Sequence, residues 1–173
     1  MGVPGLMLRL GAGFFCVAGL AGCASDNDPP AAEPSFYSSL ASTDAKVDAA
    51  MAASMISGYR SNNSLSAVRV DPQLMKLAQA QAQAMAARDK VDAVRDVGSR
   101  LRSSGYETKV AAENVGAGYH TLAQAFSGWR DSPPHRKNML LPGATHIGIA
   151  TAYAPNSKYK VFWALILAAP DRG

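Results

Sequence analysis

The stretch AENVGAGYHTLAQAFSGWRDSPPHRKNML, residues 112–140, carries the clearest local-structure signals in the chain. Residues 113–118 are short, partly β-branched and glycine-rich, which predicts a strand where another backbone passes close by. Thr121 followed three residues later by Gln124 is a capping-box pattern. Apolar residues at helical spacing follow it, so we expect an amphipathic helix that ends near Asp131.

A second short helix is expected directly after the first. Ser132 followed by Pro133 is the pattern of a helix N-cap with proline at the first helical position, and it places His135 in the opening turn. The positive end of the helix dipole disfavours imidazolium there. We therefore expect a neutral His135 that can accept a proton or bind a ligand.

The order of these features resembles a known family. A Glu-Asn pair in a strand (Glu113 and Asn114), a helix with Trp129, and Ser-Pro-x-His-Arg-x-Asn-x-Leu at residues 132–140 are similar to the CAP superfamily (cysteine-rich secretory proteins, antigen 5 and pathogenesis-related 1) in its bacterial SCP-like form. The resemblance extends over about residues 49–168. It implies an α+β fold, a three-layer α-β-α sandwich with a central, mostly antiparallel sheet, whereas hydrophobic periodicity alone indicates only mixed α and β structure.

Composition limits the possible functions. A chain of 173 residues has room for one domain with an ordinary hydrophobic core. The net charge of +4 is modest and the basic residues alternate with acidic ones, so the sequence does not favour nucleic-acid binding. Both cysteines, Cys16 and Cys23, precede the folded region, which leaves no thiol there for a disulfide, a metal or a nucleophile. Eukaryotic members of the family that the chain resembles are usually disulfide-rich.

The N-terminus has the features of a bacterial lipoprotein signal. Residues 10–20 form an apolar run of the length of a signal h-region, too short to span a bilayer comfortably. The tetrapeptide that ends at Cys23, Leu-Ala-Gly-Cys, resembles a lipobox, in which this cysteine would be diacylated and become the new N-terminus. We expect a signal peptide over residues 1–22, with translation starting at Met1 or Met7; the alternative is a plain secretory peptide with an incidental cysteine.

Residues 23–42 are rich in Ser, Asp, Asn, Ala and Pro, which is the composition of a tether. We therefore expect a lipidated tether over 23–42, within which Phe36, Tyr37 and Leu40 could dock on the domain, and a CAP domain over 43–173. The lipid on Cys23 would hold the protein on a membrane. The residue that follows Cys23 is Ala24 and not aspartate. In bacteria with two membranes, this resembles the signal that directs a lipoprotein to the outer membrane.

The remaining elements are expected from capping patterns and periodicity. They are a helix from residues 42–44 to about Arg60, a helix from Asp71-Pro72 to about Arg88, a short helix near 99–103, and strands over 146–153 and 159–168 joined by a hairpin loop.

In the family that the chain resembles, the cleft holds two histidines and two acids, sometimes with zinc or another divalent ion. The resemblance places the first histidine at Ala93, the first acid at Glu113, the second acid near Ser132 and the second histidine at His135. Glu113 and His135 are therefore the candidate catalytic and metal-binding residues. Zinc usually takes three or four protein ligands, so this pair alone would bind it weakly.

A zinc site would need His120, His146 or Asp131 as a further ligand. Without a metal, Glu113 could orient His135 as an acid-base pair, although no nucleophile motif accompanies them. The structural alternative is that the two side chains hydrogen-bond each other and connect the strand to the helix. The basic residues Arg130, Arg136 and Lys137 could bind an anionic ligand or a lipid headgroup, but a solvated helix face is the favoured interpretation.

The leading hypothesis is a non-enzymatic, lipid-anchored and extracytoplasmic protein of the bacterial envelope. It would bind a lipid or other hydrophobic ligand, peptidoglycan, or a partner protein of the envelope. The first alternative is a metal-assisted hydrolase of peptide or peptidoglycan bonds, with Glu113 and His135 as zinc ligands. The second is a structural envelope protein with a vestigial cleft.

Overall fold

The structure is a computed structural model that describes residues 1–2 and 33–171. Residues 3–22 of the expected signal peptide, Cys23 and the expected tether up to residue 32 lie outside the described residues. The unit Glu33–Gly173 is compact. None of the helices in the described part of the chain has the length and apolar character needed to cross a membrane.

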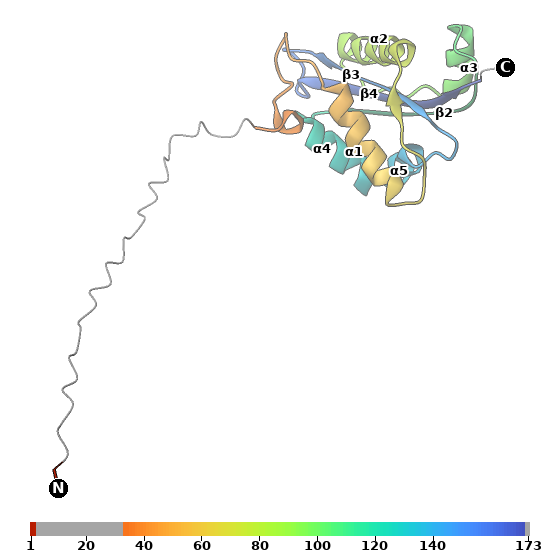
Figure 1. The fold of residues 1–173 in the computed structure, drawn as a ribbon. Coiled ribbons are helices and arrows are strands. Elements are labelled where there is room, and N and C mark those ends of the chain that lie inside the picture. Colours follow the sequence, from red (N-terminus) through yellow and green to blue (C-terminus); the bar gives the residue numbers. More distant parts are fainter. Residues whose placement is uncertain (3–32, 172–173) are drawn as a thin grey trace. The chain divides into compact units, whose positions relative to one another are not determined.

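Helices and strands are interspersed along the described chain (Figure 1). In order they are the 3₁₀ helix η1 (Ser35–Tyr37), α1 (Ala49–Ser61), β1 (Arg69–Val70), α2 (Pro72–Arg88), α3 (Val97–Ser103), β2 (Thr108–Ala117), α4 (Leu122–Asp131), α5 (Pro133–Met139), β3 (His146–Tyr153) and β4 (Val161–Pro170).

The strands form one sheet in the order β1-β3-β4-β2. β4 pairs antiparallel with both β3 and β2, and only the short β1 pairs parallel with β3. The sheet is thus mostly antiparallel, as predicted. β4 is central and nearly all of its residues are buried, which explains its almost continuous apolar sequence. β2 is an edge strand with β4 as its one described neighbour.

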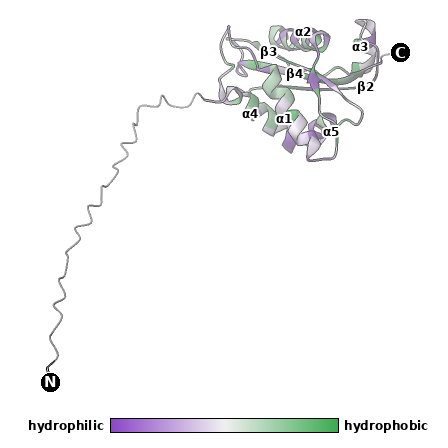
Figure 2. Cartoon of the chain, in the orientation of Figure 1, coloured by the Kyte–Doolittle hydropathy of each residue, from purple (hydrophilic) through white to green (hydrophobic). Residues whose placement is uncertain are grey.

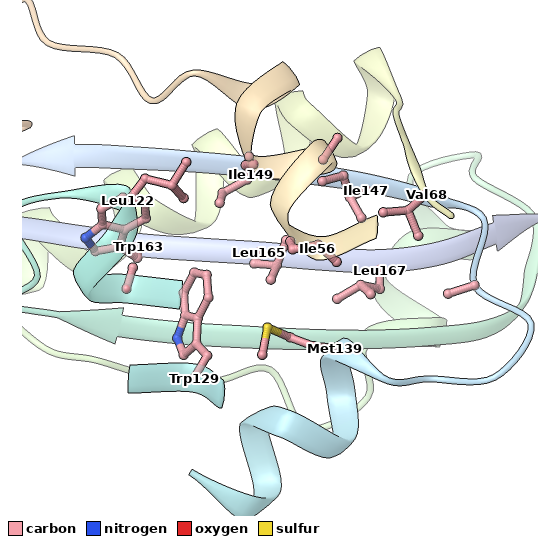
Figure 3. Packing of buried hydrophobic residues seen from close by; sticks show 14 of the residues in the cluster. Ile56, Val68, Leu122, Trp129, Met139, Ile147, Ile149, Trp163, Leu165 and Leu167 are labelled. Atoms are coloured by element: carbon pink, nitrogen blue, oxygen red, sulfur yellow. The ribbon is translucent and has the colours of Figure 1, made fainter. Parts of the chain in front are cut away.

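Helices cover both faces of the sheet and complete the predicted three-layer α-β-α sandwich (Figure 1). Hydrophobic and hydrophilic residues alternate along α2, as expected for a helix with one face against a sheet (Figure 2). On the side of α2 and α3 the core includes Leu74, Met85, Leu101, Phe162 and Ile166. On the side of α1, α4 and α5 it includes Ile56, Trp129, Met139, Trp163 and Leu165 (Figure 3).

Helix α1 begins later than expected. The three polar residues at 42–44 are each suitable N-caps, but the helix starts at Ala49 and is capped by Asp48. The carboxylate of Asp48 accepts the N–H of Met51 at 2.9 Å and the hydroxyl of Ser35 at 2.8 Å. The contact with Ser35 comes from η1, so a tertiary interaction selects the cap among residues with similar local propensity.

The end of the expected tether packs on the domain. Leu40 is buried in the core and its N–H donates to the carbonyl of His120 at 2.7 Å, while Phe36 packs against the same core. Of the three residues expected to dock, Leu40 and Phe36 therefore pack on the domain, whereas Tyr37 is exposed.

Most other boundaries agree with the predictions, except that β2 starts at Thr108 and not at residue 113, because its ladder with β4 extends to the pair of Thr108 with Pro170. α2, α4 and β3 match the expected segments, and the capping box of Thr121 is formed. α3 starts two residues early because Asp96 accepts the N–H of Ser99 at 2.8 Å as its cap. β4 starts at Val161 because Lys160 has a positive φ of 62° and belongs to the turn. Ser132 occupies the N-cap position of α5, but its side chain makes no capping bond.

Candidate functional site

An open cleft of about 540 Å³ lies beside β2. It is lined by residues 93–98, by Arg102 of α3, by Lys109 and residues 111–113 of β2, and by Asn138 of α5. The two positions that the family resemblance assigned to the first histidine and the first acid, Ala93 and Glu113, are both part of this lining. The cleft therefore brings together two of the four positions of the site that the resemblance implies.

Both carboxylate oxygens of Glu113 are engaged. Its side chain is buried and points towards α3, where Nη2 of Arg100 donates to Oε1 at 2.5 Å. The main-chain N–H of Val94 donates to Oε2 at 3.1 Å. The carboxylate is thus held by hydrogen bonds from a guanidinium and from a main-chain amide.

The network continues from Arg100 to α2. Nη1 of Arg100 donates to the side-chain oxygen of Gln81 at 3.0 Å, and the Gln81 amide donates to the carbonyl of Asp92 at 2.6 Å. Gln81 interrupts the apolar face of its helix, which predicts either a half-exposed side chain or a buried amide with partners. In the structure Gln81 is buried and its amide has hydrogen-bond partners. The network joins α2, α3, β2 and the loop that carries Ala93.

This arrangement does not fit a zinc ion. Alanine at position 93 has no ligating atom, and a metal at Glu113 would have to displace the guanidinium of Arg100. A cation next to the carboxylate also repels a metal ion. The residues of the cleft therefore do not provide the set of ligands that the family resemblance implies.

His135 belongs to the helical layer on the other face of the sheet. It lies in α5, which packs on β2 with Met139 in the core on that side. Partial burial lowers the pKa of its imidazole below the ordinary 6.5, because the charged form loses hydration. The neutral form expected from the sequence is thus favoured, with desolvation as the cause.

Two asparagines, rather than the candidate pair, connect the strand to the helix. Successive side chains of a strand point to opposite faces, so Glu113 faces α3 while Asn114 faces α5. The amide of Asn114 donates to the carbonyl of His135 at 3.0 Å, and the amide of Asn138 donates to the Asn114 side-chain oxygen at 2.9 Å. No hydrogen bond between the side chains of Glu113 and His135 is present in the described part of the chain.

The three residues considered as a further metal ligand have other surroundings. His120 is exposed before the cap of α4. His146 is buried at the start of β3, with Nε of Arg69 at 2.6 Å and Oγ1 of Thr145 at 2.8 Å from its ring nitrogens. Asp131 forms an exposed pair with its neighbour Arg130 at 2.8 Å. Across residues 33–171, no three His, Cys, Asp or Glu side chains are grouped as a metal site would require.

Arg60 is a polar core residue that sequence reasoning missed. It is fully buried at the end of α1, and burial lowers the pKa of its guanidinium. The guanidinium donates at 2.8–3.0 Å to the carbonyls of Ser66, Met139, Leu141 and Ala144. Its place four residues after Ile56 on the apolar stripe of the helix was the available signal. Through these bonds Arg60 fixes the loop that follows α5.

Comparison with known proteins gives consistent matches. The family model described as the cysteine-rich secretory protein family matches residues 53–167. The uncharacterized protein YkwD of Bacillus subtilis is 34% identical over 94 residues, which are 52% of this chain and 37% of that protein.

Two solved structures share the fold. An extracellular protein containing an SCP domain from Bacillus anthracis aligns with a TM-score of 0.57 at 22% identity, covering 68% of this chain and 39% of that chain. An outer surface protein from Borrelia burgdorferi aligns with a TM-score of 0.59 at 16% identity, covering 73% of this chain and 98% of that chain. The chain thus spans under two fifths of the length of both Bacillus proteins, at 37% and 39%.

Proposed function

The chain belongs to the cysteine-rich secretory protein (CAP) family, and we propose that it is a non-enzymatic binding protein of the bacterial cell envelope. The observation that carries the proposal is the ion pair between Arg100 and Glu113. A carboxylate that acts as a base or holds a metal ion must take up a proton or a cation, and an adjacent guanidinium opposes both. Here both oxygens already have donors, one of them a guanidinium at 2.5 Å. The cleft beside this pair stays open and can hold a ligand.

Extracytoplasmic location is supported by two lines of argument. The lipobox pattern that ends at Cys23 favours a lipid anchor, and the following alanine favours the outer membrane in a cell with two membranes. The names of two structural relatives, an extracellular protein and an outer surface protein, point to the same side of the membrane.

The charges of the cleft favour a polar ligand. Arg95, Arg102 and Lys109 line it together with two acids, Asp96 and Glu113, of which Glu113 is paired with Arg100. Of the ligands considered from the sequence, a cell-wall component or an envelope protein with acidic groups fits such a lining better than an apolar lipid does. A metal-assisted hydrolase has no supporting geometry among the described residues.

The test is incubation of the full chain with isolated bacterial peptidoglycan. We expect the protein to sediment with the cell wall and to release no soluble fragments. Fragment release that the substitution Glu113→Gln abolishes would contradict a non-enzymatic role. Absence of sedimentation would remove the cell wall as ligand and leave the envelope protein as partner.

The anchor is tested separately by cell fractionation. The wild-type chain should be found with membranes and incorporate labelled palmitate, and Cys23→Ala should lose both properties. A wild-type chain that is secreted without label would identify the N-terminus as a plain secretory signal.

A further inference from the structure

The outer edge of β2 presents main-chain groups to the cleft. β2 is the last strand in the order β1-β3-β4-β2, and in an antiparallel ladder alternate residues direct both N–H and C=O away from the partner strand. The amide of Asn138 donates to the carbonyl of Glu113 at 2.9 Å, which identifies Glu113 as an outward residue. The register of β2 with β4 is regular from Val110 onward. Ala111, two residues before Glu113, therefore also directs its N–H and C=O away from β4.

The cleft makes this edge into a groove. Residues 93–98 and Arg102 border it on the side of α3, and Asn138 borders it on the side of α5. Ala111 lies in the lining between them and has no side chain long enough to cover its own backbone. Because Asn138 already occupies the carbonyl of Glu113 and the ladder is irregular between Thr108 and Val110, strand pairing would centre on Ala111.

The charge along the groove has one dominant sign. Arg95, Arg102 and Lys109 are exposed and line the groove. Of the two acids in the lining, Glu113 is paired with Arg100, whereas Asp96 keeps its negative charge as the cap of α3 and interacts with Arg102, which leaves three cations against one such acid. The ion pair of Lys109 with Asp171 at 3.1 Å is exposed and weak. The groove is therefore complementary to negative charge.

We propose that this groove binds an extended acidic peptide, which adds a strand to the free edge of β2. Main-chain hydrogen bonds to Ala111 would set the register, and carboxylates of the peptide would lie near Arg95, Arg102 and Lys109. This inference rests on the proposed function, since it names the class of ligand for the same cleft. Edge strands that remain open attract such pairing unless they are blocked, and described side-chain bonds flank Ala111 on this strand: Asn138 donates to the carbonyl of Glu113 and Arg102 donates to that of Thr108.

The test measures fluorescence anisotropy of labelled short peptides with the full chain carrying Cys23→Ser. The first peptide alternates glutamate and valine with blocked ends, the second has lysine in place of glutamate, and the third is the acidic peptide N-methylated at alternate residues. We expect the acidic peptide to bind about tenfold more tightly than each of the other two, because the second loses charge complementarity and the third loses main-chain hydrogen bonds.

Charge-reversed variants locate the site. Arg95→Glu combined with Lys109→Glu should weaken binding of the acidic peptide about tenfold and make it less sensitive to salt. Lys76→Glu, an equally exposed reversal on α2, should leave binding unchanged.

Three results would overturn the inference: equal binding of the acidic and basic peptides, equal binding of the N-methylated peptide, or no binding of any. Cleavage of the bound peptide would instead overturn the non-enzymatic function. Absence of both binding and cleavage would exclude an acidic peptide as the ligand but would be compatible with the proposed non-enzymatic binding function.

Discussion

The guanidinium of Arg100 lies 2.5 Å from the carboxylate of Glu113, at the position where the family resemblance implies a metal-binding or catalytic acid. The side chain of Glu113 is 1% exposed and that of Arg100 is 24% exposed. The acid therefore depends on its partner for compensation of charge, and it contributes to the fold by joining β2 to α3.

Replacement of Arg100 by alanine should destabilise the protein by about 3 kcal/mol, because it leaves a buried carboxylate without its counter-ion. Urea unfolding of wild type and variant measures the difference. Arg102→Ala removes an exposed arginine from the same helix and should cost about 0.5 kcal/mol. Equal costs for the two variants would show that the pair does not stabilise the domain.

Arg60→Met should also cost about 3 kcal/mol or more, because four main-chain carbonyls lose a charged donor in the core. The loss should appear as a lower urea midpoint and as faster amide hydrogen exchange after α5. Arg136→Met, at an exposed position, is the matched control. Unchanged stability of the Arg60 variant would mean that water can replace the guanidinium at no cost.

Gly148 lets α2 lie directly on β3. A Cβ atom at this position would overlap the main chain of Leu74 and Met75, so Gly148→Ala should destabilise by about 1–3 kcal/mol. Gly58 in α1 has open space around it, and Gly58→Ala should stabilise by about 0.5–1 kcal/mol through helix propensity. Thermal unfolding of both variants distinguishes the two effects. A neutral Gly148→Ala would contradict the close helix-strand contact.

The neutral state of His135 gives the stability a dependence on pH. Burial lowers the pKa of the folded state below 6.5, so the unfolded chain binds the proton more readily. The contribution to stability is complete above the unfolded value and is lost as the pH falls through the folded pKa. Between about pH 7.5 and about pH 5.5, wild type should lose slightly more stability than His135→Gln. A smaller loss in wild type would contradict the direction of the shift.

Elements with local capping signals could be predicted from the sequence. Asp71-Pro72 and the capping box of Thr121 each mark a helix whose first turn is stabilised by its own residues. The start of α1 could not be predicted, because Asp48 is selected by a contact with η1. The two-residue strand β1 is too short for a periodic pattern and exists through its pairing with β3.

The candidate site was predicted less well than the fold. Position 93 and Glu113 line one cleft, but the partner of Glu113 is Arg100 and not His135. Spacing alone does not show which charged side chain of α3 turns inward, because that depends on how the helix is rotated over the sheet. The buried position of Arg60 could not be predicted for a similar reason, since three of its four carbonyl acceptors are about eighty residues away along the chain.

The most direct test of the central claim is a calorimetric titration of zinc into the full chain and its Glu113→Ala and His135→Ala variants. We predict no zinc binding in the micromolar range that depends on both residues, because Arg100 holds Glu113 and no third ligand is grouped with it in residues 33–171. Micromolar or tighter binding that both variants lose would contradict the account and restore the metal-assisted hydrolase.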